Sequence, residues 1–220
     1  MMRDPAVVDA IRGLDPVPKL ADHEDAARRY WRNAMKRLFD IALALPLCLL
    51  SLPLLILLGV LVRVTSRGPT FYWSLRVGRD NRIFPMPKLR TMRQGAPELA
   101  THLFEGAGQY LTPIGKFLRC SSLDELPQLF SILAGDLSFV GPRPALFNQD
   151  DLVDLRTGLG IHKLTPGLTG WAQVNGRNRL DLEEKVRFDA EYLKTQSFWF
   201  DLRILAMTIG KVILCEGINH

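Results

Sequence analysis

Residues 41–62 read IALALPLCLLSLPLLILLGVLV, an apolar run of twenty-two residues without a single charge. A helix of this length, at about 1.5 Å per residue, is long enough to cross a bilayer core of about 30 Å. Forty mixed, partly acidic residues precede the run and no small-x-small pattern follows it, so we do not expect a cleavable signal peptide. The run therefore predicts a helix that enters a membrane.

Two features of the run argue against a simple transmembrane span. Pro46 and Pro53 lie seven residues apart, hence on one face of a helix, and each removes a backbone hydrogen bond. Pro53 divides the run into pieces of twelve and nine residues, each able to reach about half of a bilayer. Basic residues also flank both ends, and positive flanks prefer the cytoplasm. They are Arg28, Arg29, Arg32, Lys36 and Arg37 before the run, and Arg63, Arg67, Arg76, Arg79 and Arg82 after it.

The simplest structure that satisfies both features is a re-entrant helix-break-helix hairpin over residues 36–64. It would dip into the membrane and return to the same face. We expect the break at Pro53, with Pro46 and the nearby Ser51 contributing to it. A kinked single span is the alternative, and either structure would associate the chain with membrane lipids.

The whole chain predicts a mostly helical α+β fold. Residues 1–35 form an extension whose basic helix suits a membrane surface or, equally, solvent. Residues 65–220 form a globular domain, in which Gly-Pro and Gly-Arg-Asp-Asn turns predict a β-hairpin. The segment from 198 to 214 begins Phe-Trp-Phe and is either an interfacial or a core-packing helix. Further helices are expected over 124–133 and 180–193.

The composition narrows the class of partner. A formal net charge of +5 and a pI near 9.3 favour anionic partners, whether nucleic acid, phosphorylated metabolites or an acidic membrane surface. Cys48, Cys120 and Cys215 lie far apart, so we expect a reducing compartment and neither a disulfide framework nor a zinc site. The four histidines are scattered singly, so a bound metal should have oxygen ligands.

Residues 121–129, SSLDELPQL, place two carboxylates, Asp124 and Glu125, where a helix is expected to begin. One interpretation is capping, because Ser122 and Glu125 have capping-box spacing and acids in a first turn complement the helix dipole. The other is chemistry, because a carboxylate can attack phosphorus while its neighbour helps to bind a metal. These nine residues alone favour capping.

Several cations stand among prolines and glycines, where they could bind substrate phosphates or simply be solvated. Arg143 is distinguished by a proline on each side, which stiffens its backbone and orients the guanidinium for an oxyanion. In LTPGLTGWAQVNGRN, residues 164–178, an aromatic and amide groups could hold a base or sugar, or merely form a hydrogen-bonded loop. The cations are Lys88, Arg90, Arg119, Arg143, Arg177 and Arg179, and the base or sugar candidates are Trp171, Gln173, Asn175 and Arg177.

Together these features favour phosphoryl transfer at a membrane surface. A half-inserted hairpin would hold the domain at head-group level, the cations would bind phosphates and the acid pair would supply a nucleophile. Such chemistry needs mainly positioning and positive charge, commonly with Mg²⁺ held by carboxylates.

Four long motifs in fixed order resemble the bacterial sugar transferases, monotopic phosphoglycosyl transferases that begin glycan assembly on polyprenyl phosphate. The resemblance extends from about Lys36 to Leu214 and is to the short, single-domain form of the family. The motifs are KRLFD (36–40), RVGRDNRIFPMPKLRTM (76–92), LRCSSLDELPQLFSILAGDLSFVGPRP (118–144) and TPGLTGWAQVNGR (165–177).

The resemblance implies a reaction. A nucleoside diphosphate-sugar, usually UDP-linked, would give its sugar-1-phosphate to polyprenyl (undecaprenyl) phosphate and release UMP. Asp124 would be the nucleophile of a covalent phosphosugar intermediate, and Asp124 and Glu125 would work with Mg²⁺. Lys88 and Arg143 would bind phosphates. Residues 65–220 would then be the catalytic domain.

Three further positions match the family's motifs. Arg119 would join the phosphate-binding cations, and Asp136 would be an additional metal ligand. The membrane break falls on Pro53, although Leu52 stands where some members have a serine. The resemblance also implies a location at the cytoplasmic face of the bacterial inner membrane and no nucleic-acid partner, and it is compatible with a homodimer.

Two other classes of function fit some of these residues. One is a non-enzymatic, basic membrane adaptor, in which Asp124 and Glu125 would serve only as helix caps. The other is a lipid-phosphate phosphatase that uses Asp124 and needs no nucleotide-sugar. No motif identifies the transferred sugar.

Overall fold

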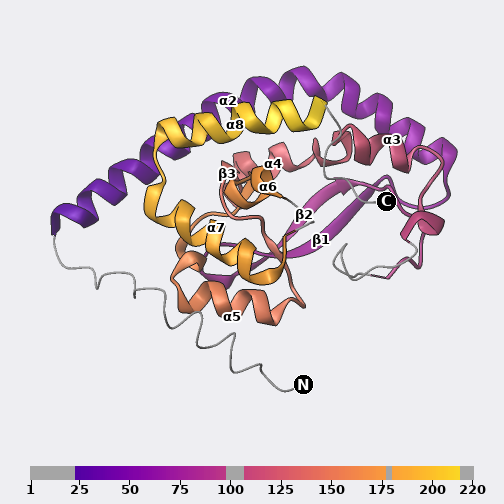
Figure 1. Cartoon of the computed structure of the whole chain (residues 1–220). Coiled ribbons are helices and arrows are strands. Elements are labelled where there is room, and N and C mark those ends of the chain that lie inside the picture. Colours follow the sequence, from indigo (N-terminus) through magenta and orange to yellow (C-terminus); the bar gives the residue numbers. More distant parts are fainter. Residues whose placement is uncertain (1–22, 98–106, 177–179, 214–220) are drawn as a thin grey trace.

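The computed structural model describes residues 23–97, 107–176 and 180–213. The expectations for residues 1–22, Arg177 and Arg179 lie outside these ranges. The described chain is a mixture of helices and two small sheets, and one long helix, α2 (His23–Thr65), arches over the remainder (Figure 1). This agrees with the predicted α+β class.

The other elements are short. In chain order they are β1 (Phe71–Val77), the turn η1 (Arg79–Asn81), β2 (Ile83–Leu89), η3 (Ala107–Tyr110), α3 (Gly115–Cys120), the 3₁₀ turn η4 (Leu123–Glu125), α4 (Gln128–Ala134), β3 (Ser138–Val140), β4 (Ala145–Leu146), α5 (Asp150–Gly158), η5 (Ile161–Lys163), β5 (Gly167–Thr169), α6 (Trp171–Asn175), α7 (Leu182–Thr195) and α8 (Phe198–Ile213).

Helix α2 runs without interruption through Pro46 and Pro53. Each proline leaves one carbonyl of the preceding turn without its amide donor, which is a usual cause of helix bending. Ser51 also stays within the helix, where its hydroxyl donates to the Cys48 carbonyl at 3.2 Å. The structure therefore has one arched helix where the sequence predicted two helices and a break (Figure 1).

One face of α2 packs on the globular part along the whole apolar run. The opposite face is apolar and exposed, with Leu50 at 77% and Leu57 at 56% exposure, which suits contact with lipid. Residues 33–65 are long and apolar enough to cross a membrane by length and composition. The buried stripe consists of Asp40, Ala44 and Cys48 in the first half and Leu55, Leu58 and Val62 in the second.

Two cations of the KRLFD motif anchor the first half of α2. Lys36 Nζ lies 2.5 Å from Asp201 Oδ2 of α8. Arg37 donates to the carbonyls of Ile132 and Leu133 at the C-terminal end of α4. Helix carbonyls at this end lack intrahelical donors, so Arg37 acts as a C-terminal cap from another helix.

The predicted β-hairpin is confirmed, with β1 and β2 paired antiparallel from Phe71 opposite Leu89 to Val77 opposite Ile83. In its turn Asp80 and Asn81 have φ of 54° and 59°, and the Arg82 amide donates to the Arg79 carbonyl at 3.2 Å. Two consecutive left-handed residues make this a type I′ turn, whose twist matches that of the flanking strands.

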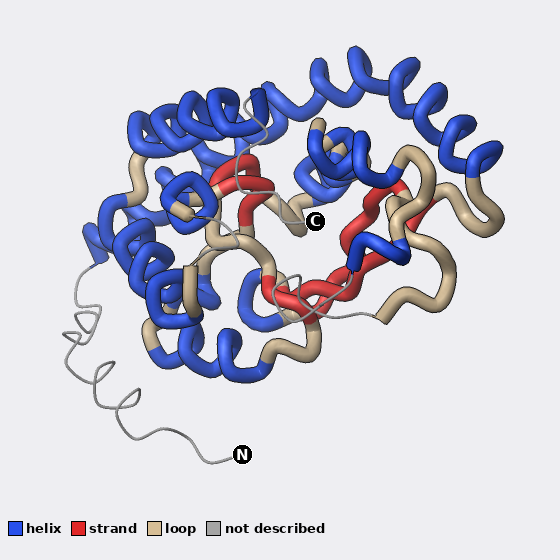
Figure 2. The backbone as a smooth tube through the Cα atoms, turned by 45° about the vertical axis from the view of Figure 1, so that its right-hand side comes forward, coloured by secondary structure: helices blue, strands red, loops and turns tan. Residues whose placement is uncertain are grey.

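The strands form two sheets that residues 141–144, GPRP, connect (Figure 2). The antiparallel sheet has the order β2-β1-β4, and β3 pairs in parallel with β5. On β2, alternation places Phe84, Met86 and Lys88 on one face. Phe84 and Met86 are buried in the main core, so Lys88 continues an inward-facing row.

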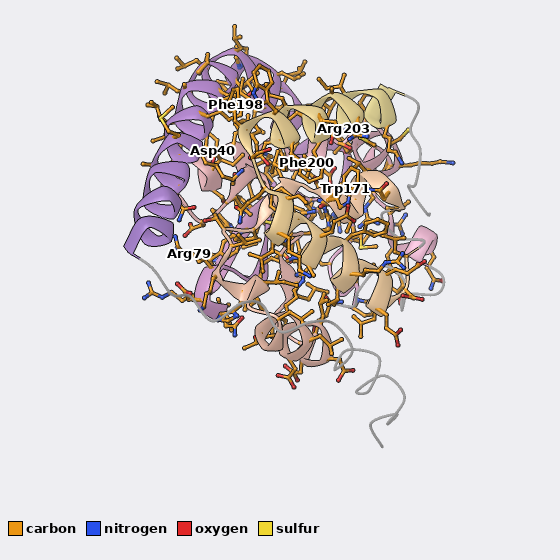
Figure 3. All side chains as sticks on the ribbon, turned by 60° about the vertical axis from the view of Figure 1, so that its left-hand side comes forward. Asp40, Arg79, Trp171, Phe198, Phe200 and Arg203 are labelled. Carbon is orange, nitrogen blue, oxygen red and sulfur yellow. The ribbon has the colours of Figure 1, made fainter. Side chains whose placement is uncertain are left out.

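The two C-terminal helices match their predictions closely. Helix α7 begins with a capping box, in which the Glu184 amide donates to Asp181 Oδ1 at 2.7 Å and the Asp181 amide to Glu184 Oε2 at 3.3 Å. Helix α8 lies beside α2 and places Phe198 edge-on to Phe39 at 5.4 Å (Figures 1 and 3). Because α8 also exposes 78% of Trp199, it has both a packed and an exposed aromatic face, and its placement at a membrane interface stays a prediction.

The expectation of reduced cysteines is wrong for Cys120, which is disulfide-bonded, whereas Cys48 is free and buried in α2. Cysteine spacing therefore gives no argument about the compartment of this protein.

Replacing Asp40 by Ala should lower the free energy of unfolding by about 1–3 kcal/mol, because a buried backbone donor would lose its acceptor. Asp40 Oδ1 accepts from the Phe139 amide at 3.0 Å and from the Ser138 hydroxyl at 3.1 Å. Denaturant unfolding in detergent measures the change. Asp136→Ala, which removes an exposed carboxylate, is the control, and equal stabilities of the two variants would contradict the anchoring role of Asp40.

Candidate active site

Asp124 and Glu125 occupy a 3₁₀ turn ahead of α4 rather than the first turn of a longer helix. Ser122 has φ of 56°, a left-handed conformation, and makes no side-chain capping bond. The capping interpretation is therefore wrong. Helix α4 begins only after Pro127, whose missing amide costs nothing at a helix start.

The Glu125 carboxylate is shared by two cations from distant parts of the chain. Lys88 Nζ of β2 lies 2.7 Å from Glu125 Oε1, and Arg143 Nη2 lies 3.3 Å from the same oxygen. The side chains of Lys88 and Glu125 are 15% and 14% exposed, so this contact is largely screened from solvent. Burial lowers the pKa of Lys88, while the charge of Glu125 opposes that effect.

Asp124 is 8% exposed, and its carboxylate accepts no hydrogen bond from the residues that the structure describes. Burial raises its pKa to about 6, and the charges of Lys88, Arg119 and Arg143 oppose that shift. A carboxyl group with this pKa is about nine tenths ionised at pH 7. Within the described part of the chain, Asp124 is thus a buried, ionisable carboxyl group that faces cations without a hydrogen bond to any of them, which leaves it available as a nucleophile.

The GPRP segment brings Arg143 to this group. The Gly141 amide donates to the Thr169 carbonyl and the Gly167 amide to the Pro142 carbonyl, both at 2.9 Å, so the segment continues the pairing of β3 with β5. A side chain at Gly141 would have its Cβ 2.5 Å from the Thr165 carbonyl oxygen. Only glycine permits this close approach.

Two other predicted cations differ in their surroundings. Arg119 lies close enough to Asp124 to affect its pKa, and its Nε donates to the Thr91 hydroxyl at 3.0 Å. Arg90 instead donates through Nη2 to the Ser66 carbonyl at 2.8 Å and to the Ser66 hydroxyl at 2.6 Å, where α2 ends. Its Nε and Nη1 are buried without a hydrogen-bond partner among the described residues.

The base and sugar candidates lie apart from the carboxylates, in and around α6. Trp171 packs against Phe188 and Phe200 at centroid distances of 6.3 and 4.9 Å, and Arg203 lies over its ring at 5.8 Å (Figure 3). Trp171 therefore joins α6, α7 and α8, and its predicted stacking on a base stays a prediction.

The amides beside Trp171 bond to nearby backbone. Gln173 Nε2 donates to the Leu168 carbonyl at 3.0 Å, and Asn175 Nδ2 donates to the Trp171 carbonyl at 2.8 Å. Gln173 Oε1 and Trp171 Nε1 are buried without partners in the described part of the chain. These contacts favour the hydrogen-bonded loop, and Arg177 lies outside the described residues.

The carboxylate pair fits Mg²⁺, whereas Asp136 does not fit the same ion. No group of three or more His, Cys, Asp or Glu side chains converges within residues 23–97, 107–176 and 180–213. Asp136 is exposed just beyond the C-terminal end of α4, whereas Asp124 precedes its N-terminal end. The helix between them is about 10 Å long. Mg²⁺ commonly takes one or two carboxylates together with substrate phosphates, and Asp124 and Glu125 supply such a pair.

Comparison with known proteins assigns the chain to a family. The family model described as bacterial sugar transferase matches residues 31–215. The chain belongs to this family. Among curated members of the bacterial sugar transferases, it is 40% identical to the uncharacterized sugar transferase EpsL of Bacillus subtilis, over 84% of this chain and 91% of that protein.

Two relatives carry an activity in their names. The chain is 38% identical to the UDP-glucose:undecaprenyl-phosphate glucose-1-phosphate transferase of Escherichia coli, over 80% of this chain and 40% of that protein. It is 34% identical to the undecaprenyl-phosphate galactose phosphotransferase of Salmonella typhimurium, over 98% of this chain and 50% of that protein. This member of the family thus spans half or less of the length of those two relatives.

The sequence did not point to three charged residues around the GPRP segment: Arg76 and Arg156 donate to its carbonyls, and Asp189 accepts from Arg156. In the sequence, Arg76 is distinguished only as one of the basic residues that follow the apolar run. Arg156 and Asp189 lie in α5 and α7, where single charges resemble an ordinary solvated helix face. Only their contacts across the fold distinguish them.

Replacing Lys88 by Met should raise the pKa of Asp124 above its value of about 6, because Lys88 lowers that pKa in the folded protein. Infrared difference titration, with Asp124→Asn in each background as the reference, measures the midpoint. Lys116→Met, which changes an exposed lysine of α3, should leave it unaltered. A midpoint in Lys88→Met at or below that of the parent protein would contradict the proximity of Lys88 to Asp124.

Proposed function

We propose that the chain transfers sugar-1-phosphate from a nucleoside diphosphate-sugar, most simply a UDP-sugar, to polyprenyl phosphate and releases UMP. The observation that carries the proposal is Asp124, a buried and ionisable carboxylate among cations that accepts no hydrogen bond from the described residues. The names of the Escherichia coli and Salmonella relatives support the same reaction for this chain.

In the first half-reaction, Lys88, Arg119 and Arg143 bind the diphosphate of the donor. Their positive charge suits this task, because phosphoryl transfer depends mainly on positioning and electrostatic stabilisation. Asp124 attacks the phosphorus that bears the sugar, and the bond from that phosphorus to the bridging oxygen breaks. UMP leaves with that oxygen, and the sugar phosphate stays on Asp124. Mg²⁺, held by Asp124 and Glu125 with the donor phosphates, would offset the negative charge.

In the second half-reaction, a phosphate oxygen of the polyprenyl acceptor attacks the same phosphorus. The bond to the Asp124 carboxylate breaks, and polyprenyl diphosphate-sugar is released. Because UMP has already left, the two anionic substrates need not occupy the small site together.

Glu125 has a separate role in this scheme. In the absence of substrate its carboxylate pairs with Lys88 and Arg143, which are the groups that a substrate phosphate would need. It therefore keeps both cations in place until a phosphate replaces it.

We further propose that the chain lies on the cytoplasmic face of the bacterial inner membrane, and the position of α2 supports a monotopic arrangement there. Both the Asp40 end and the Val62 end of the apolar run are buried against the same globular part. A helix that crossed a bilayer core of about 30 Å would carry one end away from a domain on one side. We therefore propose that α2 enters the membrane with its arched outer face and returns, which gives the domain access to a lipid-borne acceptor.

The two competing functions are less well supported. In an adaptor, the acids would cap a helix, whereas Ser122 makes no cap and Glu125 binds two cations. A phosphatase would use Asp124 equally well, so it is distinguished by its products, inorganic phosphate without any need for a nucleotide-sugar.

Asp124→Asn should reduce UMP release by at least about a thousandfold, as expected when a nucleophile is removed. The assay uses polyprenyl phosphate in nanodiscs and a panel of UDP-sugars. Asp151→Asn, at an exposed position of α5, is the matched control and should retain the activity of the unmodified protein. Incubation with a labelled UDP-sugar but no acceptor should add a sugar phosphate to the parent protein and to Asp151→Asn, but not to Asp124→Asn. Undiminished turnover in Asp124→Asn would refute the nucleophile.

The monotopic arrangement predicts that both ends of the chain lie on one side of the membrane. Tags at the two termini should be digested together by protease in inverted vesicles and be protected together in right-side-out vesicles. A periplasmic and a cytoplasmic marker protein verify the orientation of the vesicles. Protection of only one tag would establish a span and contradict the arrangement.

A further inference from the structure

The GPRP segment, residues 141–144, is held mainly by hydrogen bonds that other residues donate to its carbonyl groups. Pro142 and Pro144 lack amide protons, so the segment can be held only weakly through its own N–H groups. Its carbonyls are held instead. The Pro142 carbonyl accepts from the Gly167 amide at 2.9 Å, and the Pro144 carbonyl accepts from Arg76 Nη1 at 3.2 Å.

The carbonyl of Arg143 itself accepts from a second arginine. Arg156 Nη1, on α5, donates to it at 2.8 Å. The other side of the same guanidinium is fixed by Asp189 of α7, whose Oδ2 accepts from Nε at 3.0 Å and from Nη2 at 2.6 Å. One planar guanidinium therefore connects two helices to the backbone of Arg143, a geometry that lysine cannot reproduce.

Asp189 is buried and Arg156 is mostly covered, with side-chain exposures of 2% for Asp189 and 12% for Arg156. Removing two charges from water is expensive, and well-packed apolar residues often stabilise a protein as well as a buried ion pair does. A contribution to the stability of the whole protein is thus a weak reason for a largely buried Arg156–Asp189 pair at this position. The hydrogen bond from Arg156 to the Arg143 carbonyl is a more specific reason.

We propose that Arg156, oriented by Asp189, is a positioning residue that fixes the backbone of Arg143 so that its guanidinium reaches Glu125 and the substrate phosphate. The inference rests on the proposed function for its effect on catalysis. Arg143 contacts Glu125 at 3.3 Å and is 36% exposed, so its guanidinium faces both the acid pair and the approach of a substrate. A displacement of about 1 Å at such a group can reduce a rate by about a hundredfold.

The test is a double-mutant cycle between the ion pair and Arg143. The Arg156→Met/Asp189→Leu variant replaces the pair by apolar side chains and removes the donor to the Arg143 carbonyl. We expect UMP release to fall at least tenfold while the melting temperature is largely preserved. In an Arg143→Gln background the same replacement should cost less than twofold, because the group that it positions is already lost. Equal losses in both backgrounds would show a merely structural pair and overturn the proposal.

A second variant tests the proposal if the Arg156→Met/Asp189→Leu protein does not fold. Arg156→Lys retains a charge for Asp189 but cannot also bond to the Arg143 carbonyl, so it should lose at least tenfold in UMP release. Lys194→Met, at an exposed position of α7, is the control and should retain activity. Full activity in Arg156→Lys would overturn the proposal.

Hydrogen–deuterium exchange separates this inference from the proposed function. Peptides that cover residues 141–147 should exchange faster in the Arg156 variants than in the parent protein or in Lys194→Met, whether or not the protein turns over a UDP-sugar. A parent protein without UMP release would refute the proposed function while leaving this measurement valid. Unchanged exchange in the Arg156 variants would refute the positioning role even if the reaction is confirmed.

Discussion

The Glu125 carboxylate, shared by Lys88 and Arg143, is the contact on which the arrangement of the site depends. It joins the turn η4, which contains Glu125, to the hairpin strand β2 and to the GPRP segment. Lys88 of β2 lies 37 residues from Glu125 in sequence, and Arg143 of the GPRP segment lies 18 residues from it. Each of these elements is short and has little stability of its own. Since the two cations converge on Glu125, the neighbouring Asp124 is left as an anion in a positive, largely dry environment. A buried carboxyl group that accepts no hydrogen bond from the described residues is a feature of reaction centres more than of structural ion pairs.

A second constraint comes from the membrane. The two halves of α2 pack on separate apolar clusters of the same globular part, one with Leu129 and Ile132 of α4 and one with Leu89 and Leu118. The exposed face of the helix is apolar along its length, so the helix has one surface for protein and one for lipid. Its charged anchors, Lys36 and Arg37, precede the apolar run. In the proposed monotopic arrangement, this division keeps the charges at the membrane surface, where the phosphate of the proposed acceptor would also lie.

Much of the fold could be predicted from local pattern. The helical apolar run, the Gly-Arg-Asp-Asn turn and the helix expected over 180–193 each follow rules that operate within a few residues, whereas the break expected at Pro53 is absent from α2. The predicted start of a helix at Asp124 was wrong. Ser122 adopts a left-handed conformation there, and Glu125 bonds to cations from distant parts of the chain. Trp171 likewise has its aromatic contacts in α7 and α8, which no local pattern could indicate.

The sequence by itself determined which residues can do the chemistry. Adjacent carboxylates, a proline-bounded arginine and a proline-bent apolar run are local features, and their order along the chain identified the family before any fold was known. Only the tertiary structure decided how these residues meet. It shows Lys36 paired with Asp201 across 165 residues, Arg156 with Asp189 across 33, and Glu125 occupied by two cations. The physical reason is that hydrogen bonds and burial depend on distance in space, which a sequence pattern encodes only for neighbours along one helix or strand.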